Sequence, residues 1–241
     1  VKDEDGNLVP LVDLQGKFRA ELGDLGGKYV KNEYYAEGEE PEKSVDVELA
    51  IKLKIENKAF HVEKYIHSYP NCWRTDKPIL YYPLDSWFIK VTEFRDRMHE
   101  LNETINWKPK ATGEGRFGNW LANANDWNLS RSRYWGIPLP LWRTEDGKEE
   151  ILVSESGKPM KREADLIDVW FDSGSMPYAQ WHYPFENKEK VEATWRQADF
   201  IAEGVDQTRG WFYTLHAIAT MIFDDVAYKN VVSNGLVLDK N

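Results

Sequence analysis

The 241-residue sequence has one cysteine and no long apolar run. The single Cys72 excludes an intramolecular disulfide and fits a reducing compartment. A membrane span requires about 20 consecutive apolar residues, whereas His216 and Thr220 interrupt the longest candidate, residues 215–223. The charged start of the chain also has none of the features of a secretion signal. We therefore expect a cytoplasmic protein without a membrane anchor.

The sequence also has fewer basic than acidic residues. The sequence has 31 basic and 41 acidic residues, a net charge of −10, which argues against a dedicated nucleic-acid-binding module. If a nucleic acid is a partner, other parts of a protein must provide most of the binding surface. Hydrophobic residues make up 41% and aromatic residues 14%, which is ample for a core in one large domain or two small ones.

Apolar periodicity and turn residues predict a mixed architecture for the first two thirds of the chain. Residues 92–105 carry Phe94, Met98, Leu101 and Ile105 at helical spacing, a stripe more typical of a core face than of a cofactor contact. Thr92 is the expected N-cap of that helix. The other expected elements are a helix over 46–57, a short strand over 59–66, a helix over 116–124 and a hairpin over 139–160 with turns at 146–147 and 156–157.

The last eighty residues have a clearer pattern. We expect a buried strand over 199–202, a turn over 203–207, an apolar helix over 208–223 and a strand over 230–233, with 236–238 completing the β-α-β order. Strands that alternate with helices predict a parallel sheet, whose ligands bind beyond the carboxyl ends of its strands.

Polar residues follow the first of these strands, at such a carboxyl end. Glu203 and Asp206 flank Gly204, and their carboxylates could accept hydrogen bonds from ribose hydroxyls or an ammonium group. Gly204 would let the backbone approach a ligand closely. The alternative is that Asp206 merely caps the following helix.

Two tryptophans are candidates for an apolar pocket. Trp170 lies in the segment 167–175, where two aromatics stand between two acids before an expected turn, and Trp211 begins the apolar helix. Side by side they would form a slot for a small aliphatic group. The alternative is that each belongs to the core.

Other classes of function have weaker support. Eleven tryptophans permit a non-catalytic, Trp-rich binding module that stacks sugars, although Trp87, Trp120 and Trp142 lie in mixed apolar runs that favour burial. Cys72 has two histidines nearby but no second cysteine at zinc-ligand spacing. The sequence contains neither a serine-elbow nor a phosphate-loop motif.

Four segments, taken in order, closely resemble isoleucyl-tRNA synthetases of class I. They are His-Ser-Tyr-Pro-Asn-Cys-Trp-Arg at 67–74, Trp-Asn-Leu-Ser-Arg-Ser-Arg-Tyr-Trp-Gly-Ile-Pro at 127–138, Asp-Val-Trp-Phe-Asp-Ser-Gly at 168–174 and Glu-Gly-Val-Asp-Gln-Thr-Arg-Gly-Trp-Phe at 203–212. The resemblance is strong from about Pro70 onward and looser before it. Valine and leucine enzymes look different at 168–174 and 203–207, so isoleucine is preferred and a valyl-tRNA synthetase fragment is the alternative.

The resemblance implies an α/β fold that contains the second half of a Rossmann-like parallel sheet and a mixed α+β remnant of the editing insertion. Residues 1–70 would be the trailing part of that insertion, 71–165 a connective region and 166–241 the second half of the catalytic domain. The implied enzyme is an isoleucine–tRNA ligase that activates isoleucine with ATP and Mg²⁺ and transfers it to tRNA(Ile). We expect a monomer.

The resemblance also implies roles for individual residues. The isoleucyl-adenylate would contact Glu203, Gly204, Asp206 and Gln207, the isoleucine side chain would lie between Trp170 and Trp211, and the adenine would lie along Gly235, Leu236 and Val237. None of these residues has to act as an acid or base, because in-line attack of a carboxylate on the α-phosphate needs positioning and charge neutralisation.

The chain also departs from the family pattern. It contains neither the His-Ile-Gly-His nor the Lys-Met-Ser-Lys-Ser signature, and the editing motifs are missing, so we expect the chain alone to be inactive in activation and in editing. Some family members bind zinc through a second cysteine three positions after the one that matches Cys72. Thr75 stands there instead, and the hairpin at 142–161 is short and has no cysteine, so we expect no zinc.

Overall fold

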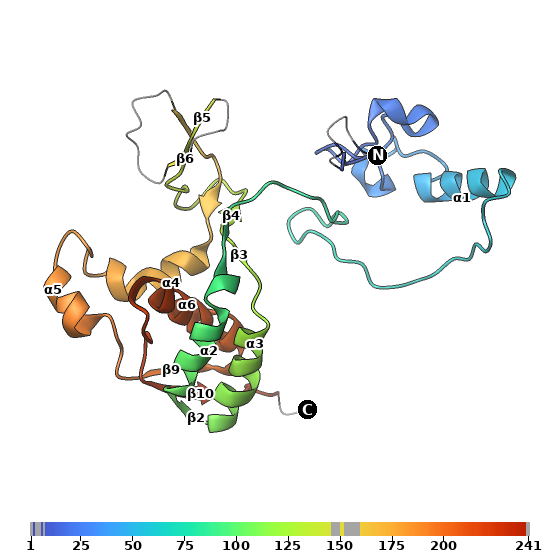
Figure 1. The fold of residues 1–241 in the computed structure, drawn as a ribbon. Helices are drawn as coiled ribbons and strands as arrows, with labels where there is room; N and C mark the ends of the chain where they lie inside the picture. The colour runs from blue at the N-terminus through green and yellow to red at the C-terminus, as the bar shows by residue number, and fades with distance from the viewer. Residues whose placement is uncertain (1, 3–5, 7, 146–149, 152–159, 240–241) are drawn as a thin grey trace. The chain divides into compact units, whose positions relative to one another are not determined.

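The computed structural model describes residues 2, 6, 8–145, 150–151 and 160–239. The chain forms two compact units, residues 1–85 and 86–241 (Figure 1). Each unit is described by itself.

The first unit has little regular structure. Its elements are the short 3₁₀ segments η1 (Ala20–Leu25) and η2 (Asn32–Tyr34) and the helix α1 (Val45–Ile55). The predicted helix over 46–57 is confirmed by α1, and the hydroxyl of Ser44 accepts a hydrogen bond from the backbone N–H of Val47 at 3.4 Å. The predicted strand over 59–66 is wrong, since these residues have no regular structure. A strand is stable only beside a partner, and none of the described residues of this unit pairs with them.

The second unit carries most of the helices and strands, with η again marking short 3₁₀ or π segments. In chain order they are β1 (Phe88–Ile89), η3 (Val91–Glu93), α2 (Arg95–Glu103), β2 (Asn106–Lys108), η4 (Thr112–Phe117), α3 (Gly118–Ala122), β3 (Trp127–Asn128), β4 (Ser130–Arg131), β5 (Trp142–Thr144), β6 (Glu150–Ile151), β7 (Met160–Arg162), β8 (Leu166–Ile167), α4 (Val169–Ala179), α5 (Lys188–Lys190), η5 (Val191–Trp195), β9 (Ile201–Gly204), η6 (Val205–Arg209), α6 (Trp211–Phe223) and β10 (Asn230–Asn234).

A three-stranded parallel sheet, in the order β2-β10-β9, fixes the fold class as mixed α/β. The chain passes from β9 through α6 to β10, so the predicted strand-helix-strand order is confirmed, with the first strand two residues later than expected. The prediction that 236–238 extends this pattern is wrong. These residues form no strand and are exposed, since none of the described strands pairs with them.

Helix α6 is the centre of the core. Nine consecutive residues of it, 212–220, are buried, as expected for a helix that is apolar on all sides. Met98 and Leu101 of α2 and the following Ile105 are also buried, so the predicted core stripe is confirmed there. In the described part of the chain, no helix combines the length and the apolar character that crossing a bilayer would need.

The helices around α6 depart from the sequence prediction at their starts. The predicted helix over 92–105 is split into η3 and α2, and Thr92 does not cap it. Instead, the backbone N–H and the hydroxyl of Thr92 donate to Asp126 Oδ1 at 3.1 and 2.8 Å. The predicted helix over 116–124 begins as the π segment η4 and ends at Ala122.

Helix α4 replaces the turn expected at the end of 167–175. Gly174, which suggested a turn, lies inside the helix. A Cβ at this position would lie 2.9 Å from the carbonyl carbon and oxygen of Thr214. The glycine therefore lets α4 lie directly against the backbone of α6.

The predicted hairpin is confirmed as antiparallel strands, with β5 between β6 and β7. It projects from the helices of its unit (Figure 1). Its two predicted turns lie outside the described residues.

Candidate functional site

The carboxyl edge of the parallel sheet brings together two predicted contact residues and the predicted adenine segment. Strands β9 and β10 end side by side, with Glu203 paired to Ser233 and Gly204 to Asn234. The segment 235–237, predicted to lie along an adenine, leaves the sheet at this edge directly after β10. Ligands of parallel sheets bind in the crevice beyond such an edge.

The turn after β9 is held by Gln207 rather than by Asp206. Gln207 Oε1 accepts a hydrogen bond from the backbone N–H of Trp211 at 2.8 Å, which caps α6. Its Nε2 donates to Asp206 Oδ2 at 3.2 Å. The alternative in which Asp206 caps the helix is therefore wrong, and its exposed carboxylate stays at the sheet edge.

Gly204 leaves room for the Asp206 carboxylate at this edge. A Cβ there would lie 2.5 Å from Asp206 Oδ1, well inside the distance that real Cβ contacts keep. The position of the Asp206 carboxylate thus depends on the absence of a side chain at residue 204.

The two candidate tryptophans both lie close to the junction between η6 and α6. Trp211 Nε1 donates to the carbonyl of Ser173 in α4 at 3.2 Å. A Cβ on Gly210 would lie 3.3 Å from Cη2 of Trp170 and 2.6 Å from Oε1 of Gln207. Trp170 is 41% exposed, so the alternative that it is an ordinary core residue does not hold.

A buried carboxylate that sequence reasoning missed lies just before Trp170. Asp168 is 3% exposed and caps α4, because its Oδ1 accepts from the backbone N–H of Trp170 at 3.3 Å. Its Oδ2 accepts a hydrogen bond from Trp127 Nε1 at 2.9 Å and forms an ion pair with Arg131 Nη2, also at 2.9 Å. The sequence signal was an aspartate directly before a helix, hidden because that helix was not predicted.

The negative charge of Asp168 also affects the pKa of a residue one helical turn away. The pKa of Asp172 is raised, first by burial and second by the negative charge of Asp168. Of the two acids that flank the aromatics in this motif, Asp168 is the one with a cationic partner.

Side chains of η4 and α3 contact segment η6. Arg116 Nε donates to the buried hydroxyl of Thr208 at 2.9 Å, and that hydroxyl donates to the carbonyl of Val205 at 2.8 Å. The guanidinium of Arg209 lies 5.1 Å from the ring centroid of Trp120. Local sequence does not predict these contacts, because the contacting residues are far apart in the chain.

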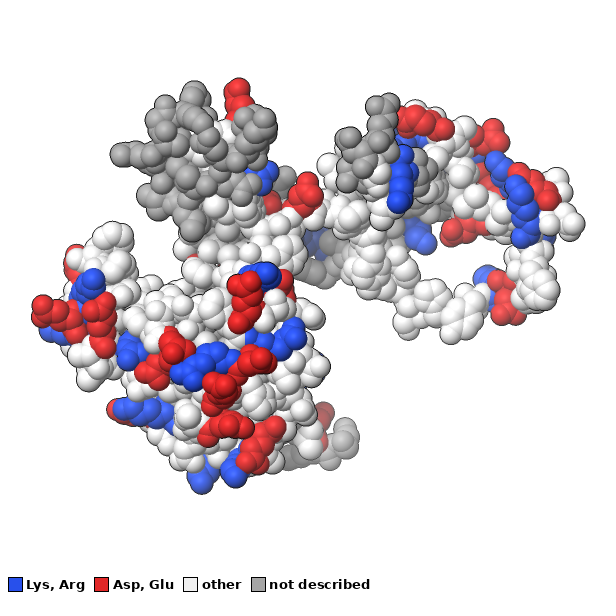
Figure 2. All heavy atoms as spheres, in the orientation of Figure 1, with Lys and Arg blue, Asp and Glu red and all other residues white. Residues whose placement is uncertain are grey.

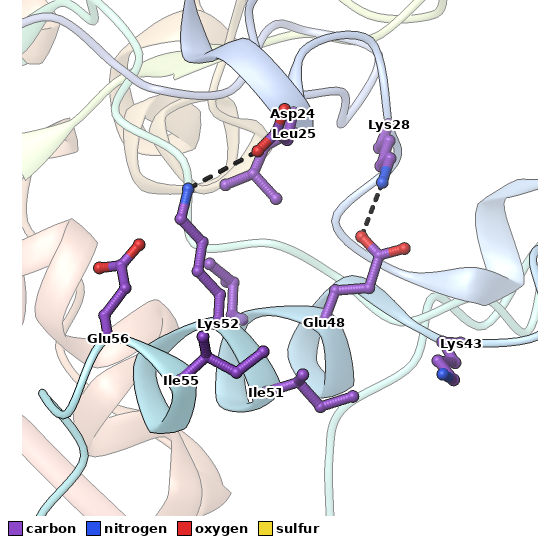
Figure 3. A pocket seen from close by; sticks show the side chains of 10 residues that line it. Asp24, Leu25, Lys28, Lys43, Glu48, Ile51, Lys52, Ile55 and Glu56 are labelled. Atoms are coloured by element: carbon purple, nitrogen blue, oxygen red, sulfur yellow. Dashed lines mark hydrogen bonds and ion pairs between the residues drawn. The ribbon is translucent and has the colours of Figure 1, made fainter.

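The first unit has a pocket of about 490 Å³ between η1 and α1 (Figure 3). Four of its charged side chains form two ion pairs. Lys28 lies 2.7 Å from Glu48, and Lys52 lies 3.9 Å from Asp24. A ligand would have to break these ion pairs, so this pocket is the weaker candidate.

Charge does not single out another site. Figure 2 shows acidic and basic side chains interspersed over the drawn face of the second unit. Among the residues that the structure describes, no three His, Cys, Asp or Glu side chains come together as metal ligands.

Comparison with known proteins agrees with the motifs. Residues 11–162 and 152–241 match the family model of the class I tRNA synthetases for I, L, M and V. The chain belongs to this family.

The curated relatives to which the chain is similar are isoleucine–tRNA ligases. The chain is 58% identical to the ligase of Cytophaga hutchinsonii over 288 residues, covering 100% of the chain and 26% of the relative. Identity is 51% with a Bacteroides fragilis ligase, covering 99% of the chain and 27% of the relative, and 44% with a Chlamydia trachomatis ligase, covering 96% and 24%. The chain therefore spans about a quarter of the length of these relatives.

The two stretches matched to the family model overlap at residues 152–162. The similarity to the Cytophaga hutchinsonii ligase extends over 288 residues, more than the 241 of this chain. That relative therefore carries residues with no counterpart here.

Proposed function

We propose that the chain is part of an isoleucine–tRNA ligase and that its second unit supplies the isoleucyl-adenylate site. The observation that carries the proposal is that Trp170, Trp211 and Gln207 all lie at the start of α6, next to the carboxyl edge of the sheet. Two large aromatic side chains and a row of polar groups at adjoining positions suit an aliphatic amino acid joined to a nucleotide.

In this proposal each part of the site binds one part of the adenylate. The exposed carboxylates of Glu203 and Asp206 accept hydrogen bonds from the ribose or the ammonium group, and residues 235–237 lie along the adenine. Trp170 and Trp211 enclose the isoleucine side chain. A single methylene in such a slot is worth about 1–3 kcal/mol, a range for which isoleucine enzymes are themselves the standard example.

The rest of the proposal follows the family. The β9-α6-β10 unit belongs to a Rossmann-like catalytic domain over 166–241, with a connective region over 71–165 and the trailing part of an editing insertion over 1–70. The partners are isoleucine, ATP with Mg²⁺ and tRNA(Ile), and the enzyme is a cytoplasmic monomer. The relatives given above are isoleucine enzymes, which favours isoleucine over valine.

The direct test is amino-acid-dependent ATP–pyrophosphate exchange by a full-length ligase that carries this segment. Isoleucine should drive exchange better than valine or leucine, and the 241-residue chain alone should give none. Exchange led by valine would replace the proposed specificity, and no exchange with any of the three would remove the proposed function.

A tryptophan substitution tests the pocket itself. Trp170→Ala in the full-length enzyme removes one wall of the proposed slot, and fully burying an isoleucine side chain is worth about 1.5–3 kcal/mol. The KM for isoleucine should therefore rise about tenfold to a hundredfold while the KM for ATP changes little. Trp142→Ala, in the projecting strand β5, is the matched control. Equal increases in both KM values would contradict the pocket assignment.

A further inference from the structure

Asp168 is anchored to residues 127–131 through both its backbone and its side chain. Strand β8, which ends just before it, pairs with β4, with Ser130 opposite Ile167. The backbone N–H of Asp168 donates to the carbonyl of Leu129 at 2.8 Å. Its buried carboxylate accepts a hydrogen bond from Trp127 and forms an ion pair with Arg131. The residue is thus fixed before the helix begins.

The first turn of α4 depends on this anchor. The N-cap oxygen satisfies one of the backbone N–H groups that a helix leaves unpaired at its start. Here that N–H belongs to Trp170, the residue whose ring reaches over Gly210. Any shift of the cap therefore moves the base of the Trp170 side chain.

We propose that Asp168, held by Trp127 and Arg131, is a positioning residue that sets the Trp170 ring against the start of α6 and so determines the width of the aliphatic amino-acid slot. This inference rests on the proposed function. Asp168 itself touches no substrate and acts through Trp170.

Only a carboxylate can fill this position. Its two oxygens accept two hydrogen bonds, from the Trp170 backbone and the Trp127 indole, and its charge pairs with the Arg131 guanidinium. An asparagine offers one oxygen and one NH₂ group. In one orientation the asparagine NH₂ faces the N–H groups of Trp127 and Arg131. In the other orientation it faces the backbone N–H of Trp170, and the helix cap is lost.

Arg131 compensates the buried negative charge of Asp168. An unpaired buried carboxylate is costly, and the Arg131 guanidinium is itself fixed, because its Nη1 donates to the carbonyls of Asn128 and Ser130 at 2.8 Å each. The motif over 127–138 and the motif over 168–174 are thereby joined by one ion pair.

The test is a double-mutant cycle in the full-length ligase with the variants Asp168→Asn, Trp170→Ala and both together. In pyrophosphate exchange, Asp168→Asn should raise the KM for isoleucine about tenfold or more, since misplacement of about 1 Å can cost a hundredfold. The KM for ATP should stay within about twofold. When Trp170 is already alanine, Asp168→Asn should add little further, because the two residues act as one unit.

Two further variants complete the design. Trp127→Phe keeps a ring and the Asp168 charge but removes one donor, so it serves if Asp168→Asn does not fold, with the same pattern at a smaller size. Asp224→Asn breaks another Arg–Asp pair, to Arg97 at 2.6 Å at the far end of α6, and should leave the KM for isoleucine unchanged.

The outcomes separate the two proposals. If Trp170→Ala does not raise the KM for isoleucine, the pocket assignment fails. If it does, but Asp168→Asn leaves that KM unchanged or adds its full effect to the double variant, the positioning role alone is overturned.

Discussion

Gly174→Ala tests whether the close contact between α4 and α6 exists. The new Cβ would lie 2.9 Å from the carbonyl carbon and oxygen of Thr214 and 2.9 Å from Cδ1 of Ile218. The isoleucine methyl can rotate away, but the helix backbone cannot. The two helices must therefore separate by several tenths of an ångström, which weakens the packing along their whole contact.

The expected magnitude is a balance of two effects. Replacing glycine by alanine inside a helix stabilises it by about 1 kcal/mol, whereas overpacking a core costs about 1–3 kcal/mol. Two of the three clashing atoms are backbone, which places the cost near the top of that range. We expect Gly174→Ala to lower the free energy of unfolding by about 1–2 kcal/mol.

A matched glycine isolates the packing effect. Gly115 lies in η4, and a Cβ there would meet nothing within 4 Å, so Gly115→Ala should be neutral or stabilising. Urea unfolding followed by tryptophan fluorescence reports on the second unit, because Trp73 is the one tryptophan of the first unit. If Gly174→Ala were as stable as Gly115→Ala, the inferred contact would be wrong.

Two buried polar groups give further predictions. Burial lowers the pKa of His216 from 6.5 to about 4. Below about pH 6.5 the unfolded chain therefore binds a proton that the folded chain does not. The free energy of unfolding should fall by about 3 kcal/mol by pH 4. His216→Gln keeps an N–H donor for the carbonyl of Met98 but cannot titrate, so urea unfolding at pH 7 and 4.5 should show a smaller loss than in the parent; equal losses would refute this. Tyr228→Phe removes a 2.9 Å hydrogen bond to the carbonyl of Phe212 and should cost about 1 kcal/mol in the same assay, whereas unchanged stability would mean that the bond does not form.

Sequence pattern predicted the elements whose signal is local. The strand, apolar helix and strand over 199–233 follow from an apolar run between polar turns. Helix α4 was missed because Gly174 and Pro177 are typical of turns, and what keeps a glycine inside this helix is its contact with α6. Such a reason lies in another segment and cannot be read from local pattern.

The candidate site shows the same division. The motifs identified Trp170 and Trp211, but the contact that brings Trp170 over Gly210 depends on how α4 packs on α6. The Asp168–Trp127 hydrogen bond joins residues 41 positions apart, so neither motif alone predicts it. Cap preferences favoured Asp206, whereas the 3₁₀ turn of η6 brings the longer Gln207 side chain to the start of α6.

Gln207 links the two halves of the site. The polar half is set by the register of β9 and β10, and the apolar half is set by the packing of α4 on α6. The Gln207 side chain contacts both, because its oxygen caps the helix that starts with Trp211 and its nitrogen donates to Asp206. A carboxylate at this position would still cap the helix but would repel Asp206. The amide, which both accepts and donates, is therefore the group that can hold the helix start and the carboxylate in register.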